Sequence, residues 1–346
     1  MPRTVCCLLL SGLLLFTRGG TLAAQPAHEA LLRDRFQAEL QQLADGFDGV
    51  AGLHLVDLAS GHHFDVRGDW VFPQASAIKV LILLELFRRA ESEPTLRRER
   101  VELTAANRTA GSGVLQVLTD GGSALSLEDH AIYMIQHSDN TSTNILLDRL
   151  GMPAVNALAV ALGAPSARFQ RKMIQPEASA RGDENIATPR DAATIMTRIA
   201  TCDLPMSATT CARVKQILQL PKGGPTRAAV PSSVPVAFKP GGITGVATTW
   251  AIIGLPGREY VLTVMTNYGG DGDALIDQVG RAAFAYFSKL AGATPHGTRV
   301  SPMLLRRVAP RDTLLNKQGG PPTATPPDRQ ATVPITSRSP RRDHRP

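Results

Sequence analysis

The spacing of apolar positions at the start of the chain predicts one helix followed by two strands. Residues 27–45 repeat apolar side chains every three or four positions, which is typical of an amphipathic helix packed on a sheet. Residues 50–58 and 63–66 are short β-rich runs, and the glycine-containing turn between them favours a hairpin.

The middle of the chain, about residues 71–224, has the pattern of a helical region. Ser126 precedes two acidic residues, as expected of an N-terminal cap, and Gly151 is placed as a C-terminal cap. Residues 171–185 are polar and irregular, which predicts a long surface loop. The expected helices are 76–89, 114–118, a segment that starts at 126, 142–150, 153–162, 188–201 and 208–220.

Strand patterns return near the end of the chain, at 236–239, 248–255 and 260–267, before a last helix at 273–290. The predicted fold class is therefore α/β (α+β), with a mainly antiparallel five-stranded sheet built from both chain ends and flanked by helices. This sheet lobe covers about 25–70 and 225–290, and the segment from about 71 to 224 forms an inserted all-helical lobe. A cleft between the lobes is the natural place for a functional site.

The first 24 residues have the features of a secretory signal peptide. Arg3 precedes an apolar stretch at 5–16, and small residues at 21–24 form a cleavage region. The apolar stretch is too short to span a bilayer comfortably, so no stable membrane span is expected. The sequence therefore predicts a periplasmic or secreted protein.

The net charge of +7 resides at the C-terminal end. Residues 291–346 contain ten Lys or Arg and three Asp, so this segment accounts for the whole excess. The segment is also rich in Pro, Gly and Thr, which predicts a disordered basic tail. The body is near neutral, so no nucleic-acid partner is expected.

Two cysteines, Cys202 and Cys211, lie in the part of the chain that would be exported. Export leads to an oxidising compartment, so we expect a disulfide that closes a short loop. The alternative is a pair of buried free thiols.

The candidate chemistry begins at Ser76 and Lys79, at the start of a strongly apolar run. Residues three apart share one face of a helix. A lysine removed from water has a lowered pKa and can accept a proton from a neighbouring serine, which makes the serine nucleophilic. Taken alone, the pair is also compatible with a helix cap followed by a surface lysine.

Two further motifs change that reading: Ser138-Asp139-Asn140 follows a predicted helix, and Lys239-Pro240-Gly241 lies on a late strand. Together with Ser76-x-x-Lys79, this order resembles the class A β-lactamase family of penicillin-recognising serine hydrolases, as a divergent member. The resemblance extends over about 27–290. Further matches are Phe72-Pro73, Asn144, and Gly182 to Asn185 before Thr188-Pro189.

The resemblance implies a role for each motif residue. Ser76 would be the acylated nucleophile and Lys79 would help to deprotonate it. Ser138 would relay a proton to the leaving nitrogen, and Lys239 would hold Ser138 and attract the substrate carboxylate. For substrate binding, Asn140 would contact the acyl-amide group, Asp139 would hold its turn, and the N–H groups of Ser76 and Gly242 would form an oxyanion hole.

Two positions depart from the family pattern. Pro240 stands where the family has Thr or Ser, so a hydroxyl contact to the substrate carboxylate is missing. Proline is tolerated on an edge strand. Counting back from Gly182 puts Met173 where the water-activating glutamate belongs, and Glu177 is the nearest acid.

The resemblance implies an exported serine β-lactamase that opens the β-lactam amide, and so breaks down β-lactam antibiotics, through a Ser76 acyl-enzyme. Alternatives are a D-alanyl-D-alanine peptidase-like enzyme, another serine hydrolase, or a slow-turnover penicillin-binding protein. The substrate would be a small β-lactam or a peptidoglycan-derived peptide. No cofactor or metal is expected, since the sequence holds no ligand cluster, and the protein is expected to be a monomer.

Overall fold

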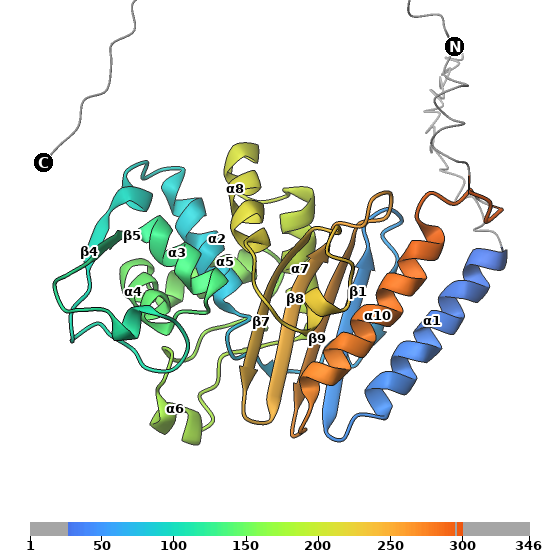
Figure 1. The fold of residues 1–346 in the computed structure, drawn as a ribbon, viewed down its shortest axis with the longest axis horizontal. Helices are drawn as coiled ribbons and strands as arrows, with labels where there is room; N and C mark the ends of the chain where they lie inside the picture. Colours follow the sequence, from blue (N-terminus) through green and yellow to red (C-terminus); the bar gives the residue numbers. More distant parts are fainter. Residues whose placement is uncertain (1–26, 295, 300–346) are drawn as a thin grey trace, which may run out of the picture. The chain divides into compact units, whose positions relative to one another are not determined.

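The central sheet is antiparallel and takes its strands from both ends of the chain. The computed structural model describes residues 27–294 and 296–299. Its strand order is β2-β1-β9-β8-β7 (Figure 1), which confirms the predicted five-stranded sheet. The strands are β1 (Val50–Asp57), β2 (His63–Val66), β7 (Val236–Ile243), β8 (Val246–Ile253) and β9 (Tyr260–Asn267).

Helices cover both faces of this sheet. Helices α1 (Ala27–Asp45) and α10 (Gly272–Leu290) lie side by side on one face (Figure 1), and α7 (Pro189–Thr201) packs on the other. Successive side chains of a strand point to opposite faces. Leu262 therefore joins the core under α1 and α10, whereas Val261 joins the core under α7.

The helical region is built around α2 (Lys79–Ala90), which is buried from Lys79 to Phe87. Apart from Lys79 and Glu85 this buried stretch is apolar, as expected of a helix in a protein interior, and α2 packs against α3, α4, α5 and α8. The predicted cap at Ser126 is confirmed, since its side chain accepts from the Asp129 N–H in a capping box. These surrounding helices are α3 (Leu127–Gln136), α4 (Asn140–Leu150), α5 (Met152–Ala161) and α8 (Ala208–Gln219).

Several short elements differ from the prediction because two to five residues are too few to show a periodic pattern. The predicted surface loop 171–185 contains a short helix, α6 (Pro176–Ala180). Helix α2 begins at Lys79, so Ser76 lies in the preceding turn instead of in the helix. Other short elements are β3 (Phe72–Pro73) paired with β6 (Ile186–Ala187), β4 (Arg100–Glu102) paired with β5 (Ala124–Ser126), α9 (Pro225–Ala228), and two 3-10 turns at Leu96–Arg98 and Leu115–Val117.

A disulfide joins Cys202 and Cys211, so the prediction is confirmed and the free-thiol alternative is wrong. Cys202 ends α7 in a left-handed backbone conformation, and Cys211 lies in the first part of α8. The bond therefore fixes the turn between two helices that both pack near the sheet.

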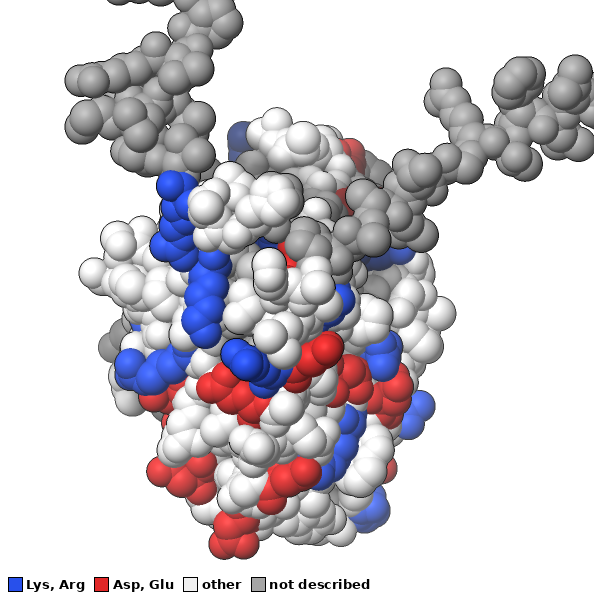
Figure 2. Space-filling view, turned by 90° about the vertical axis from the view of Figure 1, so that its right-hand side faces the viewer, with Lys and Arg blue, Asp and Glu red and all other residues white. Residues whose placement is uncertain are grey.

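The predicted signal peptide and almost all of the basic tail lie outside the described residues. Within the described residues, no helix is long and apolar enough to cross a membrane. Figure 2 shows the side of the molecule on which α1 and α10 lie, where basic and acidic side chains occur side by side. This mixed surface agrees with a body that carries little net charge.

Candidate active site

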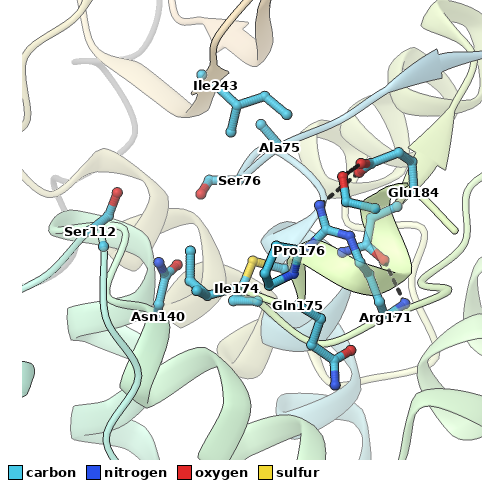
Figure 3. A pocket seen from close by; sticks show the side chains of 15 residues that line it. Ala75, Ser76, Ser112, Asn140, Arg171, Ile174, Gln175, Pro176, Glu184 and Ile243 are labelled. Carbon is cyan, nitrogen blue, oxygen red and sulfur yellow. Dashed lines mark hydrogen bonds and ion pairs between the residues drawn. The ribbon is translucent and has the colours of Figure 1, made fainter. Parts of the chain in front are cut away.

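Ser76 lies in the turn between β3 and α2, where it lines a cavity (Figure 3). The preceding residue, Ala75, has a positive φ of 45°, a conformation that costs energy for a residue with a Cβ. Among the described residues, neither the Ser76 N–H nor its Oγ has a hydrogen-bond partner. Both groups therefore remain available at the cavity.

A buried glutamine that the sequence analysis missed, Gln74, holds this turn in place. Gln74 is fully buried, and its Oε1 accepts from Trp250 Nε1 at 2.9 Å. Its Nε2 donates to the carbonyl oxygens of Phe72 (2.9 Å) and Ala187 (3.3 Å). Buried amides need such partners, so Gln74 ties the turn before Ser76 to strands β3, β6 and β8.

The edge strand β7 lies directly against the same turn. A Cβ added at Gly241 would come within 2.6 Å of the Gln74 carbonyl oxygen and 2.7 Å of the Ala77 nitrogen. Only glycine permits this approach. Gly242 comes next and lines the cavity with Ser76, so the predicted oxyanion-hole residues do lie on the walls of one cavity.

Lys79 and Lys239 converge on Ser138 from two different elements. Lys79 Nζ donates to the Ser138 carbonyl oxygen (2.7 Å), Ser138 Oγ (3.3 Å) and Asn140 Oδ1 (2.9 Å). Lys239 Nζ donates to Ser138 Oγ (3.1 Å) and to the carbonyl oxygen of Pro240 (2.8 Å). The three sequence motifs are therefore joined by direct hydrogen bonds.

Both lysines are removed from water, with 0 % and 1 % of Lys79 and Lys239 exposed. Burial lowers the pKa of Lys79 to about 7, although the Asp139 carboxylate opposes the shift. Burial, and then the charges of Lys79 and Lys222, hold the pKa of Lys239 well below its ordinary value. With a pKa of about 7, Lys79 is neutral for part of the time near pH 7 and can accept a proton.

Lys222 is a third cation near Lys239, and the sequence analysis did not single it out. Its Nζ donates to the carbonyl oxygens of Leu218 (2.7 Å) and Leu220 (3.0 Å) and lies 4.7 Å from the ring centroid of Phe238. Burial lowers the pKa of Lys222 to about 8. Since its partners are carbonyl groups and an aromatic ring, Lys222 adds positive charge to this end of the site.

Asp139 holds the backbone of its motif, as predicted. Its Oδ1 accepts from the Ser142 N–H (2.8 Å) and caps α4, while its Oδ2 accepts from the Leu115 N–H (2.9 Å). Ser138 itself has a positive φ of 54°. Strained non-glycine residues gather at functional sites, and here the strain points the Ser138 side chain at two lysines.

The cavity has a volume of 420 Å³ and is bounded by several segments far apart in sequence. Ser112 and Asn140 lie on one side of Ser76, and Arg171 and Glu184 lie on the other (Figure 3). Glu184 is the one acidic side chain on the described walls; its carboxylate is paired with Arg171 at 2.7 Å and accepts from the Ser179 hydroxyl. The negative charge of Glu184 is therefore balanced by Arg171 on this part of the wall.

The position expected to hold a water-activating glutamate is apolar. Met173 lines the cavity and is held at both backbone groups by Asn144, which accepts from the Met173 N–H (2.9 Å) and donates to its carbonyl oxygen (3.2 Å). Ile174 lines the cavity next to it with a positive φ of 56°. Glu177 is exposed on α6 and is not part of the described wall, so its position does not fit a role as the base.

The edge position of Pro240 matches the expectation from the sequence. Strand β7 ends the sheet, so Pro240 pairs on one side only, opposite Thr249 on β8.

Within the described residues, no group of three or more His, Cys, Asp or Glu is placed to hold a metal ion.

The sequence matches the model of the Beta-lactamase enzyme family over residues 35–287. The chain belongs to this family. It is a divergent class A member: it is 28 % identical over 243 residues to β-lactamase SME-1 of Serratia marcescens, covering 67 % of this chain and 80 % of that protein. It spans only 57 % of β-lactamase L2 of Stenotrophomonas maltophilia, at 30 % identity over 53 % of this chain.

Several solved structures superpose on the described fold. The β-lactamase of Sphaerobacter thermophilus DSM 20745 has a TM-score of 0.67 at 29 % identity and covers 73 % of this chain and 97 % of its own. PBP-A also has a TM-score of 0.67 at 29 % identity, covering 74 % of this chain and 96 % of its own. The L158E mutant of PBP-A, in an acyl-enzyme complex with penicillin G, has a TM-score of 0.68 at 29 % identity and covers 74 % of this chain and 97 % of its own.

Proposed function

We propose that this chain opens the amide of a β-lactam ring through an acyl-enzyme on Ser76, and that it releases the acyl group slowly. The observation that carries the proposal is the group in which Ser138 Oγ accepts from Lys79 at 3.3 Å and from Lys239 at 3.1 Å beside the Ser76 turn. Acyl transfer needs a nucleophile, a route for its proton and donors for the oxyanion. Each has a candidate in this site.

The proton route runs through Lys79 and Ser138. Ser76 Oγ attacks the lactam carbonyl carbon, and its proton passes to Lys79, whose pKa of about 7 leaves it partly neutral. Lys79 returns a proton through Ser138 Oγ to the lactam nitrogen as the carbon–nitrogen bond breaks. The N–H groups of Ser76 and Gly242 stabilise the oxyanion.

Asn140 and Lys239 would bind the substrate on either side of this reaction. Asn140 steadies Lys79 through its Oδ1 and binds the acyl-amide group of the substrate. Lys239 draws in the substrate carboxylate, without the hydroxyl that Pro240 cannot supply. Pro240 therefore leaves Lys239 as the group proposed to bind the substrate carboxylate at this edge.

Slow release follows from the wall that faces the acyl group. Water that attacks an ester needs a positioned base, which contributes about 10²–10⁴ in rate. Met173 and Ile174 are apolar, and Glu184 is paired with Arg171. No described side chain on this wall is a free carboxylate, so water attack proceeds without one.

The same features favour a second candidate function, a D-alanyl-D-alanine peptidase-like enzyme acting on a peptidoglycan-derived peptide. Its acylation chemistry at Ser76 is identical. An apolar wall that disfavours attack by water is compatible with an acyl-enzyme that persists until an acceptor other than water takes the acyl group. The disulfide between Cys202 and Cys211 supports an oxidising location for either enzyme, periplasmic or secreted.

One experiment tests acylation and release together. Purified protein is mixed with a chromogenic cephalosporin while colour and intact mass are followed on the same sample. We expect a burst close to one equivalent, an adduct on Ser76 and a slow steady rate, with no adduct in Ser76→Ala. No burst and no adduct would refute β-lactam chemistry, and fast continuous turnover would refute slow release.

A further inference from the structure

A buried hydroxyl on β8 lies between the two segments that carry the predicted oxyanion-hole groups. Thr248 has 1 % of its surface exposed. Its Oγ1 donates to the Gln74 carbonyl oxygen at 2.9 Å and lies 3.4 Å from the Gly241 carbonyl oxygen. Since a hydroxyl has one hydrogen, the two carbonyl groups share it, and the nearer one receives the better bond. Thr248 therefore joins the turn before Ser76 to the edge strand β7.

On the Ser76 side, the carbonyl oxygen of Gln74 is a fixed point of the turn. It accepts from the Ala77 N–H at 3.0 Å as well as from Thr248 Oγ1. Gln74 precedes Ser76 by two residues and Ala77 follows it directly, so these two bonds hold the backbone on both sides of Ser76. The position of the Ser76 N–H at the cavity therefore depends on the carbonyl group that Thr248 holds.

On the β7 side, one peptide group carries both the second carbonyl and the second N–H. The Gly241 carbonyl and the Gly242 N–H belong to this group, and in a planar trans peptide they point in opposite directions. The carbonyl points towards β8, since it lies within reach of Thr248, the residue that pairs with Gly241. The Gly242 N–H therefore points away from β8, and Gly242 lines the cavity.

The two segments and β8 are packed closely around this hydroxyl. A Cβ added at Gly241 would lie 2.6 Å from both the Gln74 carbonyl oxygen and Thr248 Oγ1. Trp250 is two residues further along β8, on the same face, and its Nε1 donates to Gln74 Oε1 at 2.9 Å. Gln74 is thus tied to β8 through its side chain as well as its backbone. Of these two ties, the Thr248 hydroxyl is the one that also reaches Gly241.

We propose that Thr248 is a positioning residue of the oxyanion hole, and that its hydroxyl sets the distance between the Ser76 and Gly242 N–H groups. This inference rests on the proposed acylation of Ser76. Oxyanion donors act on charge that develops in the transition state, so displacing one slows acylation more than it weakens substrate binding. Removal of a whole donor costs about 10²–10³ in rate, and a displaced donor should cost less.

The test measures acylation of Ser76 over a range of penicillin G concentrations by quenched-flow intact mass. The fit gives the limiting acylation rate and the dissociation constant of the noncovalent complex. Thr248→Val keeps the β-branched shape without the hydroxyl and should lower the limiting rate about 10–100-fold. The dissociation constant should stay within about twofold of the wild-type value.

Two further variants at position 248 separate the hydroxyl from the shape of the side chain. Thr248→Ala has no hydroxyl and places no extra methyl group against Gln74, and its limiting rate should fall as in Thr248→Val. Thr248→Ser restores a hydroxyl and should recover most of the wild-type rate.

The matched control is Thr263→Val on β9. Thr263 is also fully buried, and its hydroxyl donates to the carbonyl oxygens of His54 (2.9 Å) and Pro189 (2.8 Å). The control therefore loses the same kind of bridge, but Thr263 is not among the described residues that line the cavity. Both valine variants should lower the melting temperature by similar amounts, whereas Thr263→Val should keep the wild-type limiting rate.

A vibrational measurement reports on the oxyanion hole itself. The ester carbonyl of the Ser76 adduct would accept from the two N–H groups, and stronger hydrogen bonds lower its stretching frequency. Infrared difference spectra with a penicillin isotopically labelled at the lactam carbonyl carbon should show this band at higher frequency in Thr248→Val than in wild type. The band should not move in Thr263→Val, because a general loss of stability leaves the two N–H groups in place.

The outcomes separate this inference from the proposed function. A wild-type limiting rate in Thr248→Val and Thr248→Ala, an equal loss of rate in Thr263→Val, or an unmoved carbonyl band in Thr248→Val would overturn the role of Thr248. So would a Thr248→Ser variant as slow as Thr248→Val. Absence of any adduct in wild type would overturn acylation at Ser76, and this inference with it.

Discussion

The burial of Lys79 makes a quantitative prediction about stability and pH. Its pKa is about 7 in the folded protein against an ordinary value of 10.5, so folding opposes protonation. Above pH 10.5 the lysine is neutral in both states and costs nothing. As the pH falls towards 7, the unfolded chain binds a proton that the folded protein does not, so the stability falls.

The size of this effect follows from the two pKa values. Lys79 destabilises the folded protein by about 2 kcal/mol at pH 9 and by about 5 kcal/mol at pH 6. The variant Lys79→Met removes this titration. Relative to wild type, we therefore expect it to gain about 2–3 kcal/mol more at pH 6 than at pH 9. The charge of Lys79 also lowers the pKa of Lys239 in the folded protein. Removing Lys79 therefore raises the pKa of Lys239, which adds to the gain in stability at pH 6.

Urea denaturation of wild type and Lys79→Met at both pH values measures this difference. The comparison between pH values cancels the constant cost of the hydrogen bonds that Lys79 makes to Ser138 and Asn140. The control is Lys289→Met, which removes an exposed lysine from α10 and should have the same effect at both pH values. An equal effect of Lys79→Met at the two pH values, or a larger gain at pH 9, would refute the argument.

Three further predictions concern the turn, the wall and the disulfide. Trp250→Phe leaves Gln74 Oε1 buried without its donor, so the unfolding free energy, measured by urea titration, should fall by about 1–3 kcal/mol. The double variant Trp250→Phe/Gln74→Met should recover part of this loss. Additive losses in the double variant would contradict this account. Met173→Glu should speed decay of the Ser76 adduct about 100-fold, measured by intact mass. The control Glu177→Gln should leave the decay rate unchanged. Equal adduct lifetimes in wild type and Met173→Glu would argue against a missing base. Reduction of the disulfide should lower the unfolding free energy by about 2–3 kcal/mol, and an equal midpoint with and without reductant would contradict that value.

Much of the sheet and of the candidate site was predictable from local pattern. Four of the five strands span eight residues in the structure, long enough for an apolar run to show, and four of the five predicted strands lie within two residues of their observed bounds. Strand β7 was the exception, because Pro240 and two glycines mask its continuation to Ile243. The catalytic candidates were identified from three short motifs, and the structure joins those motifs through hydrogen bonds to Ser138 and Asn140.

The position of Ser76, the candidate nucleophile, depended on contacts that no local pattern contains. Ser76 was expected inside a helix, but the close approach of Gly241 and the buried amide of Gln74 fix it in a turn. Gln74 is polar, so the sequence alone does not distinguish a buried residue from a solvated one. Its partner Trp250 lies on β8, far away in the chain.

The sequence by itself determined the order of the long helices and of the five strands of the central sheet, the residue types of a candidate acyl-transfer site and the two departures at Met173 and Pro240. Only the tertiary structure decided what those residues can do. The pKa values of Lys79 and Lys239 depend on burial by several separate segments, because desolvation sums over everything nearby. The same holds for Glu177: its place in the sequence is compatible with a base, and only the course of the loop shows that it faces solvent.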